Sequence, residues 1–347
     1  MMGEIRKKIV TIGGGTGSFT LLSGLKKYPV DISAIVSMAD DGGSTGVLRD
    51  ELGVLPPGDV RQCLVALSES SETLRELMGY RFEEGGLKGH SFGNLFLSAL
   101  EKVEGSFSRG VEEASKILNI KGEVIPVSED SMKLHIGLKN GKVLIGENNL
   151  DHNEEIRKIG IEKVFLKPRV SACKKALEKI RQADMIVIGP GDMYGSILPI
   201  FLVREIADAI RKSKAKIVFN CNLTNKRGQT ENFTIDDYVR VAEEYIGKKK
   251  IGYVTFNSKR IPADLVRKYE SHEGKGSVIK FHAGYDRRRS FRVVTADVLN
   301  ANEPARNKND LISASRAFIR HDSDKLAKVI MMLLEIGDYE KIIKGIF

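Results

Sequence analysis

The stretch Lys8–Ser18, KIVTIGGGTGS, decides the fold. A short apolar run rich in strand-forming residues ends abruptly in the glycine-rich sequence Gly13–Ser18, and an amphipathic helix pattern follows at once. Glycine lets the backbone turn with positive φ and lets a ligand approach closely. The free N–H groups and the positive dipole end of a helix then face an anion. The stretch therefore predicts a strand, a turn and a helix start that together bind phosphate.

This turn differs from the usual dinucleotide-binding fingerprint. Gly13 and Gly15 match the first two positions of G-x-G-x-x-G, but Ser18 stands where the third glycine is expected. A tight turn without a ligand, as in any α/β protein, is the alternative interpretation. The pattern favours a nucleotide site that is related to, but different from, that of a dehydrogenase.

Composition narrows the class of protein. A chain of 347 residues can form one large α/β domain or two smaller ones, and 41% hydrophobic with 29% charged residues is ordinary for a globular protein. No apolar run approaches the ~18 residues of a membrane span, and MMGEIRKK lacks a secretory apolar region. The cysteines are few and far apart: Cys63, Cys173 and Cys221. We expect a cytoplasmic protein without disulfides or a membrane span.

The net charge of +9 raises the question of nucleic-acid binding. Lysines and arginines are spread over the expected helix faces, and only Arg287–Arg289 with Arg292 form a dense cluster. No recognised nucleic-acid-binding module surrounds that cluster. A basic surface also attracts small phosphorylated ligands. We therefore expect a small anionic ligand rather than a nucleic acid.

A second expected strand, Ile32–Met38, ends in Asp40 and Asp41, followed by glycines. Ligands of open α/β sheets lie beyond the carboxyl ends of the strands. Either carboxylate could hold a ribose hydroxyl, a magnesium ion or an acceptor hydroxyl. An Asx turn before glycine is the alternative.

The next helix is expected to start after Pro56-Pro57-Gly58, with Asp59 as its N-cap. Arg61 then lies in the first turn, where the helix dipole disfavours a cation. We interpret Arg61 as a candidate phosphate ligand.

The alternation of strands and helices continues along the chain. The run Met185–Ile188 ends in a second glycine turn, Gly189–Gly191, before another helix, so two such turns could clamp the two ends of a diphosphate. Further strands are expected over apolar runs at Lys216–Asn220, Ile251–Phe256, Val278–Phe281 and Arg292–Ala296.

One region departs from this alternation of strands and helices. Between Glu123 and Leu150, short alternating runs flank Asn140-Gly141, a strong hairpin signal, and the α/β pattern resumes from Lys163. The sequence thus predicts a single α/β domain over residues 1–347. We expect it to be three-layered and Rossmann-like, with a mostly parallel sheet flanked by helices and a β-hairpin excursion at residues 121–150.

Six motifs, in order along nearly the whole chain, resemble the CofD/YvcK family. They are GGGTGS (13–18), ADDGGSTG (39–46), LPPGDVRQCLVAL (55–67), GHSFGNLFLSAL (89–100), GPGDMYGSILP (189–199) and IRHDSDKLA (319–327). The match is most similar to the YvcK-like branch, UPF0052-type proteins called gluconeogenesis factors.

The resemblance implies one of two functions. The YvcK-like branch is associated with binding UDP-sugars, notably UDP-N-acetylglucosamine, and with cell shape and cell-wall synthesis during gluconeogenic growth. The CofD transferase moves a phospholactyl-type group from a guanosine diphosphate-linked donor to a deazaflavin acceptor with magnesium.

The resemblance also implies site residues. It assigns the diphosphate to Gly13, Gly14, Gly15, Thr16, Gly17 and Ser18. It assigns the metal or acceptor position to Asp40 and Asp41, with Asp59 as a possible second metal ligand beside Asp40. It assigns the lining of the nucleotide cleft to Asn94, Gly189, Gly191, Tyr194, Asn220 and Asn222. Further ligand contacts are implied for Arg320 and Tyr269.

Three stretches depart from the family pattern. Asp192 stands where a serine is usual after Gly-Pro-Gly, so its charge either weakens anion binding or caps the helix. Asn225–Gly228 replaces a loop of T-Q-P-G type. Tyr285–Arg292 carries four arginines of its own.

We favour a regulatory protein that binds a UDP-sugar such as UDP-N-acetylglucosamine or UDP-glucose and needs no cofactor. The first alternative is a transferase of the 2-phospho-L-lactate transferase type with magnesium on Asp40. The second is an NAD-binding protein with Asp40 on the ribose. Cell-wall-synthesis proteins are candidate partners, and we expect a homo-oligomer.

Overall fold

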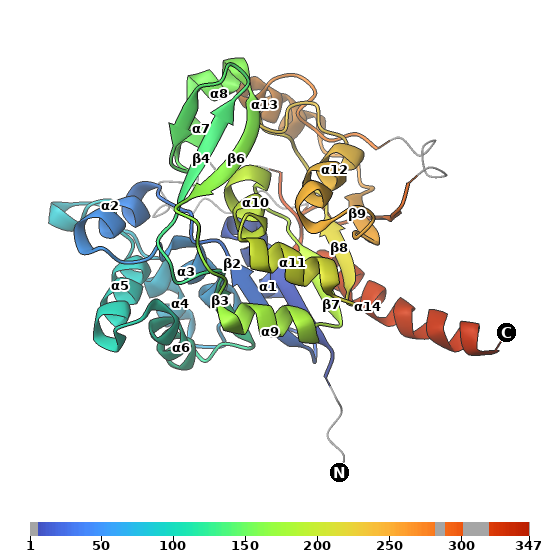
Figure 1. Ribbon diagram of the computed structural model, residues 1–347, viewed down its shortest axis with the longest axis horizontal. Helices are drawn as coiled ribbons and strands as arrows, with labels where there is room; N and C mark the ends of the chain where they lie inside the picture. Colours follow the sequence, from blue (N-terminus) through green and yellow to red (C-terminus); the bar gives the residue numbers. More distant parts are fainter. Residues whose placement is uncertain (1–5, 282–288, 301–318, 347) are drawn as a thin grey trace, which may run out of the picture.

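A seven-stranded parallel sheet forms the centre of the protein. The computed structural model describes residues 6–281, 289–300 and 319–346 (Figure 1). The strand order is β10-β9-β8-β7-β1-β2-β3, and every neighbouring pair is parallel. The strands are β1 (Lys8–Ile12), β2 (Asp31–Val36), β3 (Glu123–Pro126), β7 (Met185–Ile188), β8 (Lys216–Asn220), β9 (Tyr253–Asn257) and β10 (Arg292–Ala296).

The direction in which strands are added reverses beside β1. From β1 the chain adds β2 and β3 on one side, and later β7 to β10 on the other, with Ile9 paired to Met185 and to Ile32. The central strands are buried on both faces, which explains their continuous apolar runs. In open α/β sheets this switch point is where ligands bind.

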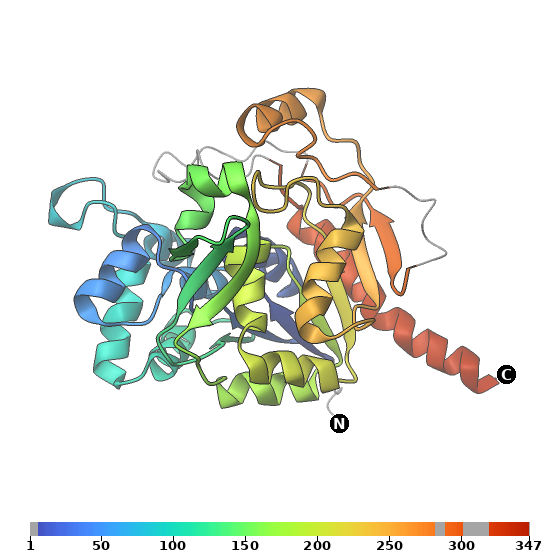
Figure 2. The same ribbon diagram turned by 45° about the horizontal axis from the view of Figure 1, so that its top comes forward.

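Helices cover both faces of the sheet and confirm the expected three-layer Rossmann-like α/β class. Helix α1 packs against α3 and α14, whereas α9 packs against α11 and α11 against α12. Figures 1 and 2 show these two groups on opposite sides of the sheet, with α14 running out toward the C-terminus. The helices are α1 (Gly15–Leu25), α2 (Gly43–Leu52), α3 (Gly58–Leu67), α4 (Glu72–Gly79), α5 (Phe92–Glu104), α6 (Phe107–Ile117), α7 (Asn149–His152), α8 (Glu154–Ile159), α9 (Lys174–Gln182), α10 (Leu198–Phe201), α11 (Arg204–Lys212), α12 (Ile235–Ile246), α13 (Ala263–Glu273) and α14 (Ser323–Ile346).

The antiparallel excursion exists, and its hairpin lies within residues 121–150, but the small sheet that contains it extends beyond them. Strands β4 (Lys133–Leu138), β5 (Val143–Ile145) and β6 (Ile161–Lys167) form a separate sheet in the order β5-β4-β6. The Asn140-Gly141 hairpin joins β4 to β5 as expected. However, β3 belongs to the main sheet, and β6 pairs antiparallel with β4 instead of resuming the α/β pattern. Figure 1 shows this small sheet in green at the top of the molecule.

The expected strand at residues 278–281 and the arginine cluster at residues 287–292 differ from the sequence-based expectations or lie partly outside the described residues. No strand runs over the described residues Val278–Phe281, because Val278 forms only an isolated bridge with Thr224. Arg287 and Arg288 lie outside the described residues, whereas Arg289 pairs with Asp236 at 2.7 Å. Among the helices of the described ranges, none combines the length and the apolar character needed to cross a bilayer.

Candidate functional site

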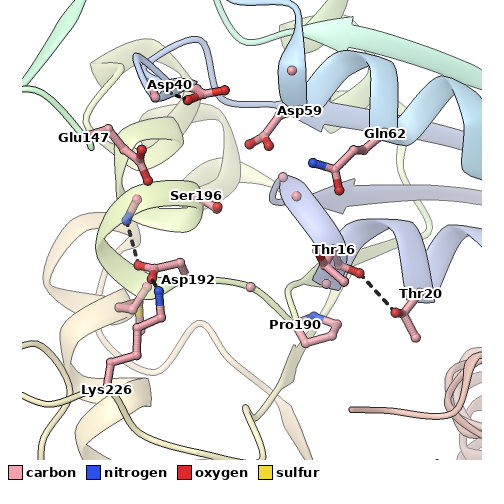
Figure 3. A pocket seen from close by; sticks show the side chains of 18 of the residues that line it. Thr16, Thr20, Asp40, Asp59, Gln62, Glu147, Pro190, Asp192, Ser196 and Lys226 are labelled. Atoms are coloured by element: carbon pink, nitrogen blue, oxygen red, sulfur yellow. Dashed lines mark hydrogen bonds and ion pairs between the residues drawn. The ribbon is translucent and has the colours of Figure 1, made fainter. Parts of the chain in front are cut away.

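A cleft of about 700 Å³ lies at the switch point, where the carboxyl ends of β1 and β7 meet (Figure 3). Its walls come from both glycine turns, the starts of α2 and α3, the loop after β8, Tyr269 of α13 and the segment Ile319–His321. Glu147, which follows β5, closes one side. The volume is within the usual range for a small-molecule site.

The two glycine turns pack directly on each other. A Cβ on Gly17 would overlap the carbonyl of Pro190 and lie 3.0 Å from the Gly191 nitrogen. Two asparagines at the end of β8 hold the second turn: Asn220 Nδ2 donates to Gly189 O at 2.8 Å, and Asn222 Nδ2 donates to Gly191 O at 2.9 Å. The floor of the cleft is therefore a junction of backbones at which a side chain has no room.

Each glycine turn is already capped by a carboxylate of the protein. The Gly15 N–H donates to Asp59 at the start of α1. Asp192 Oδ1 accepts from Tyr194 N at 3.0 Å and Gly195 N at 2.8 Å, in the π-helical turn Met193–Ile197. Charge complementary to an anionic ligand must therefore come partly from cations.

Asp59 was expected to cap α3, and this expectation is wrong. The residue at the N-cap of α3 is Pro57, and Asp59 lies in the first turn with its carboxylate directed at the start of α1. Gly14 has no room for a side chain because its Cβ would lie 2.7 Å from Asp59 Cγ. The packing of α3 against α1 thus brings Asp59 into the cleft.

Asp40 and Asp59 form a pair of neighbouring acids. Asp40 Oδ1 accepts from Gly42 N at 2.9 Å, the Asx turn weighed above. Burial raises the pKa of Asp40. Burial and the charge of Asp40 together raise the pKa of Asp59 to about 7, against the Gly15 hydrogen bond that lowers it. Each carboxylate disfavours ionisation of the other, which a nearby cation would relieve.

These two acids fit a magnesium ion only in part. Mg²⁺ usually keeps several waters and is held by one or two carboxylates together with substrate phosphates. In the described ranges, no group of three or more His, Cys, Asp or Glu side chains is arranged to hold a metal ion. An ion on Asp40 and Asp59 would therefore draw its other ligands from water and substrate.

Asp192 also forms the ion pair that faces the cleft. Lys226 Nζ lies 2.6 Å from Asp192 Oδ2. Burial alone would raise the pKa of Asp192, but Lys226 and the two N–H donors hold it below its ordinary value. The two departures from the family pattern, at position 192 and in the loop at 225–228, are thus partners in space, and the carboxylate caps its turn.

The structure brings most of the expected site residues to the cleft. Those that line it are Gly14, Gly15, Thr16, Gly17, Asp40, Asp59, Asn94, Gly191, Asn222, Tyr269 and Arg320. Those that stand behind this lining are Gly13, Ser18, Gly189 and Asn220.

Two expected residues turn away from the cleft. The π-helical turn directs Tyr194 into a separate cavity that it shares with Arg240 and Tyr245. Asp41 Oδ1 accepts from Asn148 N at 2.9 Å and so binds the segment after β5. Asp41 is therefore a support for the small sheet, whereas Asp40 faces the cleft.

Arg61 lines the cleft, but its guanidinium is held by the protein. Nε donates to Asn94 Oδ1 at 2.9 Å, and NH1 donates to Met78 O at 3.3 Å. The side chain is buried, and its stem lies against Gly93 at the start of α5. Arg61 thus joins α3 to α4 and α5, which explains a cation at an unfavourable helix position.

We expect Arg61→Ala to lower the free energy of unfolding by about 2–3 kcal/mol. The substitution removes buried packing and leaves the Asn94 and Met78 oxygens without this donor. Urea denaturation measures the loss. Arg75→Ala, a change of the same type in α4, is the control and should cost about 1 kcal/mol or less. Equal losses for the two variants would contradict the role assigned to Arg61.

His321 lies beside Arg320 and was not expected in the site. It is nearly buried and hydrogen bonds to the backbone of Cys221, next to Asn222. Burial lowers its pKa from 6.5 to about 4. The imidazole is therefore neutral in the folded protein at neutral pH.

This shift predicts an acid-sensitive contribution to stability. Below pH 6.5 the unfolded chain protonates His321 and the folded protein does not, until pH falls to about 4. Across this window, the wild type should lose about 1.4 kcal/mol per pH unit relative to His321→Asn. Denaturation of both proteins from pH 7.5 to pH 4.5 tests this. A pH-independent difference would contradict it.

Several lining residues carried no local signal in the sequence. They are Arg81, Glu147, Lys226, Gln229 and Thr230. Glu147 reaches the cleft from the segment after β5, and Gln229, in the loop after β8, donates from Nε2 to Leu150 O at 2.6 Å. Among these residues, only Lys226 had another kind of signal in the sequence, because the loop at 225–228 departs from the family pattern.

Comparisons with known proteins give a consistent result. The family described as 2-phospho-L-lactate transferase CofD matches residues 9–299. A gluconeogenesis factor of Bacillus subtilis is 38% identical over 336 residues, 96% of this chain and 100% of the relative. Another, from Halalkalibacterium halodurans, is 42% identical over 281 residues, 80% and 85% of the two chains. A crystal structure of a UPF0052 family member from Bacillus halodurans has a TM-score of 0.83 at 36% identity, over 95% of this chain and 100% of the other.

Proposed function

This chain belongs to the CofD family, and from that premise we propose that its cleft binds a nucleotide sugar as a regulatory ligand. The ligand we propose is a UDP-sugar, UDP-N-acetylglucosamine or UDP-glucose, and the protein acts in the cytoplasm during gluconeogenic growth. The observation that carries the proposal is the junction of two glycine turns at the switch point of the sheet, beside a cleft of about 700 Å³. Crevices at this position bind nucleotides in open α/β sheets.

The lining suggests how such a ligand is held. The diphosphate would lie over the backbone junction near Gly17 and Gly191, with Lys226 and Arg320 supplying positive charge. Tyr269, whose hydroxyl accepts from Thr224 at 2.9 Å, and Asn222 offer polar groups to the rest of the ligand. Binding would leave the ligand unchanged, and the protein would report the ligand's level to its partners.

Calorimetric titration with UDP-N-acetylglucosamine, UDP-glucose, GDP and NAD, each with and without magnesium, tests this function. We expect UDP-sugars to bind with micromolar affinity without magnesium and to be recovered intact. Preference for NAD in direct competition would support a dinucleotide-binding protein instead. Binding of GDP only with magnesium would favour a transferase.

A magnesium-dependent transferase is the second candidate, and the Asp40–Asp59 pair favours it. Asp40 and Asp59 would hold the ion, which when bound supplies positive charge to the phosphate oxygens of a donor. Magnesium-dependent turnover that Asp40→Asn abolishes would establish this activity. Asp41→Asn is the matched control, because Asp41 is directed away from the cleft, and it should retain the activity.

We also propose that the protein is a homo-oligomer that contacts cell-wall-synthesis proteins and so influences cell shape. Light scattering with and without a UDP-sugar tests the first part. Purification of tagged protein from cells grown on a gluconeogenic carbon source tests the second. A monomer in both ligand states would contradict the oligomer.

A further inference from the structure

We propose that Lys226 is the residue that makes the cleft selective for ligands with phosphate charge, and that Asp192 is its counter-ion while no ligand is bound. On binding, the ammonium group would move from Asp192 to the phosphate. This inference rests on the proposed function and adds a specificity-determining pair to it.

The backbone that carries Lys226 is held in place from several sides. Lys226 N donates to Thr230 Oγ1 at 3.0 Å, and Arg227 N donates to Glu273 Oε2 at 3.0 Å. Gly228 packs so closely on α8 that a Cβ would lie 2.6 Å from Arg157 Cα. The loop is thus fixed, whereas the four-carbon stem of lysine is flexible. Side-chain rotation alone can redirect the charge.

Asp192 does not depend on Lys226 for its hydrogen bonds. Its Oδ1 is held by Tyr194 N and Gly195 N at a helix start, and only Oδ2 contacts Lys226. Removal of the ammonium group therefore leaves the carboxylate bound to two backbone donors and favoured by the helix dipole. When the ion pair opens, Asp192 therefore keeps its two backbone hydrogen bonds.

The position of the pair suits a phosphate near the second glycine turn. Asp192 directly follows Gly191, and both line the cleft with Lys226. Figure 3 shows Asp192 and Lys226 side by side. A phosphate at this turn meets the negative charge of Asp192, which Lys226 must offset. Two other cations of the lining, Arg61 and Arg81, donate to oxygens of the protein. Lys226 is a lining cation whose partner, Asp192, is an anion that a phosphate can replace.

A neutral ligand gains nothing by separating this pair, whereas a phosphate gains a charge-assisted hydrogen bond. Asp192 would therefore lower the affinity for phosphate, and Lys226 would raise it. Neither residue should change the affinity for a ligand without phosphate. The two residues together would set how strongly the cleft distinguishes a UDP-sugar from its uncharged fragment.

The experiment compares Lys226→Met, Asp192→Asn and the double variant by calorimetry with UDP-N-acetylglucosamine and with uridine. Lys226→Met should weaken UDP-sugar binding about ten- to hundredfold. Asp192→Asn keeps the oxygen that caps the turn and should tighten binding several-fold. The double variant should lie between them, and the affinity for uridine should change less than about twofold in all three. Lys226→Arg, which keeps the charge, should retain most of the binding.

The possible results separate this inference from the proposed function. Suppose that wild type binds the UDP-sugar. If Lys226→Met binds it equally well, or if its affinity for uridine falls as much as its affinity for the UDP-sugar, this inference is wrong while the proposed function stands. If wild type binds no nucleotide, the proposed function fails, and inorganic pyrophosphate then tests the pair alone. The inference predicts a pyrophosphate-induced rise in Tm that Lys226→Met removes. A rise that persists in this variant, or no rise in the wild type, overturns it.

Discussion

Gly17→Ala should lower the free energy of unfolding by about 3 kcal/mol and abolish nucleotide binding. Its methyl group would overlap the Pro190 carbonyl and approach the Gly191 nitrogen within 3.0 Å. These neighbours are backbone atoms at the end of a buried strand, so they cannot rotate away, and overpacking of this kind reaches the upper part of the usual range. The two glycine turns would have to separate, and the floor of the cleft, which their junction forms, would be disrupted.

Gly79→Ala is the matched control for this substitution. Gly79 ends α4, and a Cβ there would meet nothing within 4 Å. Alanine is the better helix former, so this variant should be as stable as the wild type or slightly more stable. Urea denaturation and calorimetry of both variants make the comparison. Wild-type binding by Gly17→Ala would contradict the place of this junction in the site.

Asp59→Asn should change how stability depends on pH. The pKa of Asp59 is about 7 in the folded protein, against an ordinary value of 3.8. Between these values the folded state binds more protons than the unfolded state, so wild-type stability falls as pH rises toward 7. Asparagine keeps an oxygen for the Gly15 N–H and removes the charge. From pH 5 to pH 8, the variant should gain about 3 kcal/mol relative to the wild type.

Denaturation of wild type and Asp59→Asn across this range measures the effect. The acid-sensitive contribution of His321 has the opposite sign, but it is common to both proteins and cancels in the difference. Above pH 7, magnesium should raise the Tm of the wild type and not that of the variant, if Asp40 and Asp59 hold the ion. Parallel pH profiles would contradict the raised pKa of Asp59.

The fold could be predicted from the sequence because its central strands carry strong signals. The buried runs at Ile9–Ile12 and Met185–Ile188 each end in glycines before an amphipathic helix, and both lie in the main sheet as expected. The limits of the antiparallel part were less predictable. The α/β pattern was expected to resume from Lys163, but nothing local indicates whether the strand at residues 161–167 joins β4 or the main sheet.

The candidate site could be predicted where a functional residue lies on a turn that the sequence marks. It was less predictable where the packing of elements determines which side chains face the cleft. Asp40 lines the cleft and Asp41 does not, although they are adjacent in the same motif. The first N–H groups of both helices were expected to face phosphate, with a cap by Asp192 as the alternative at the second helix. Instead, Asp59 and Asp192 accept from them, and for Asp59 this follows from helix packing that no local pattern reports.

The central position of β1 in the sheet also affects how the chain folds during its synthesis. One edge of β1 pairs with β2 soon after synthesis begins, but the other waits for β7, since Ile9 pairs with Met185. At ordinary translation rates, this interval is on the order of ten to thirty seconds. During that time, an apolar strand edge is open and prone to association with other chains. Yield in cells should therefore depend on chaperones and on translation speed over the segment between the two strands.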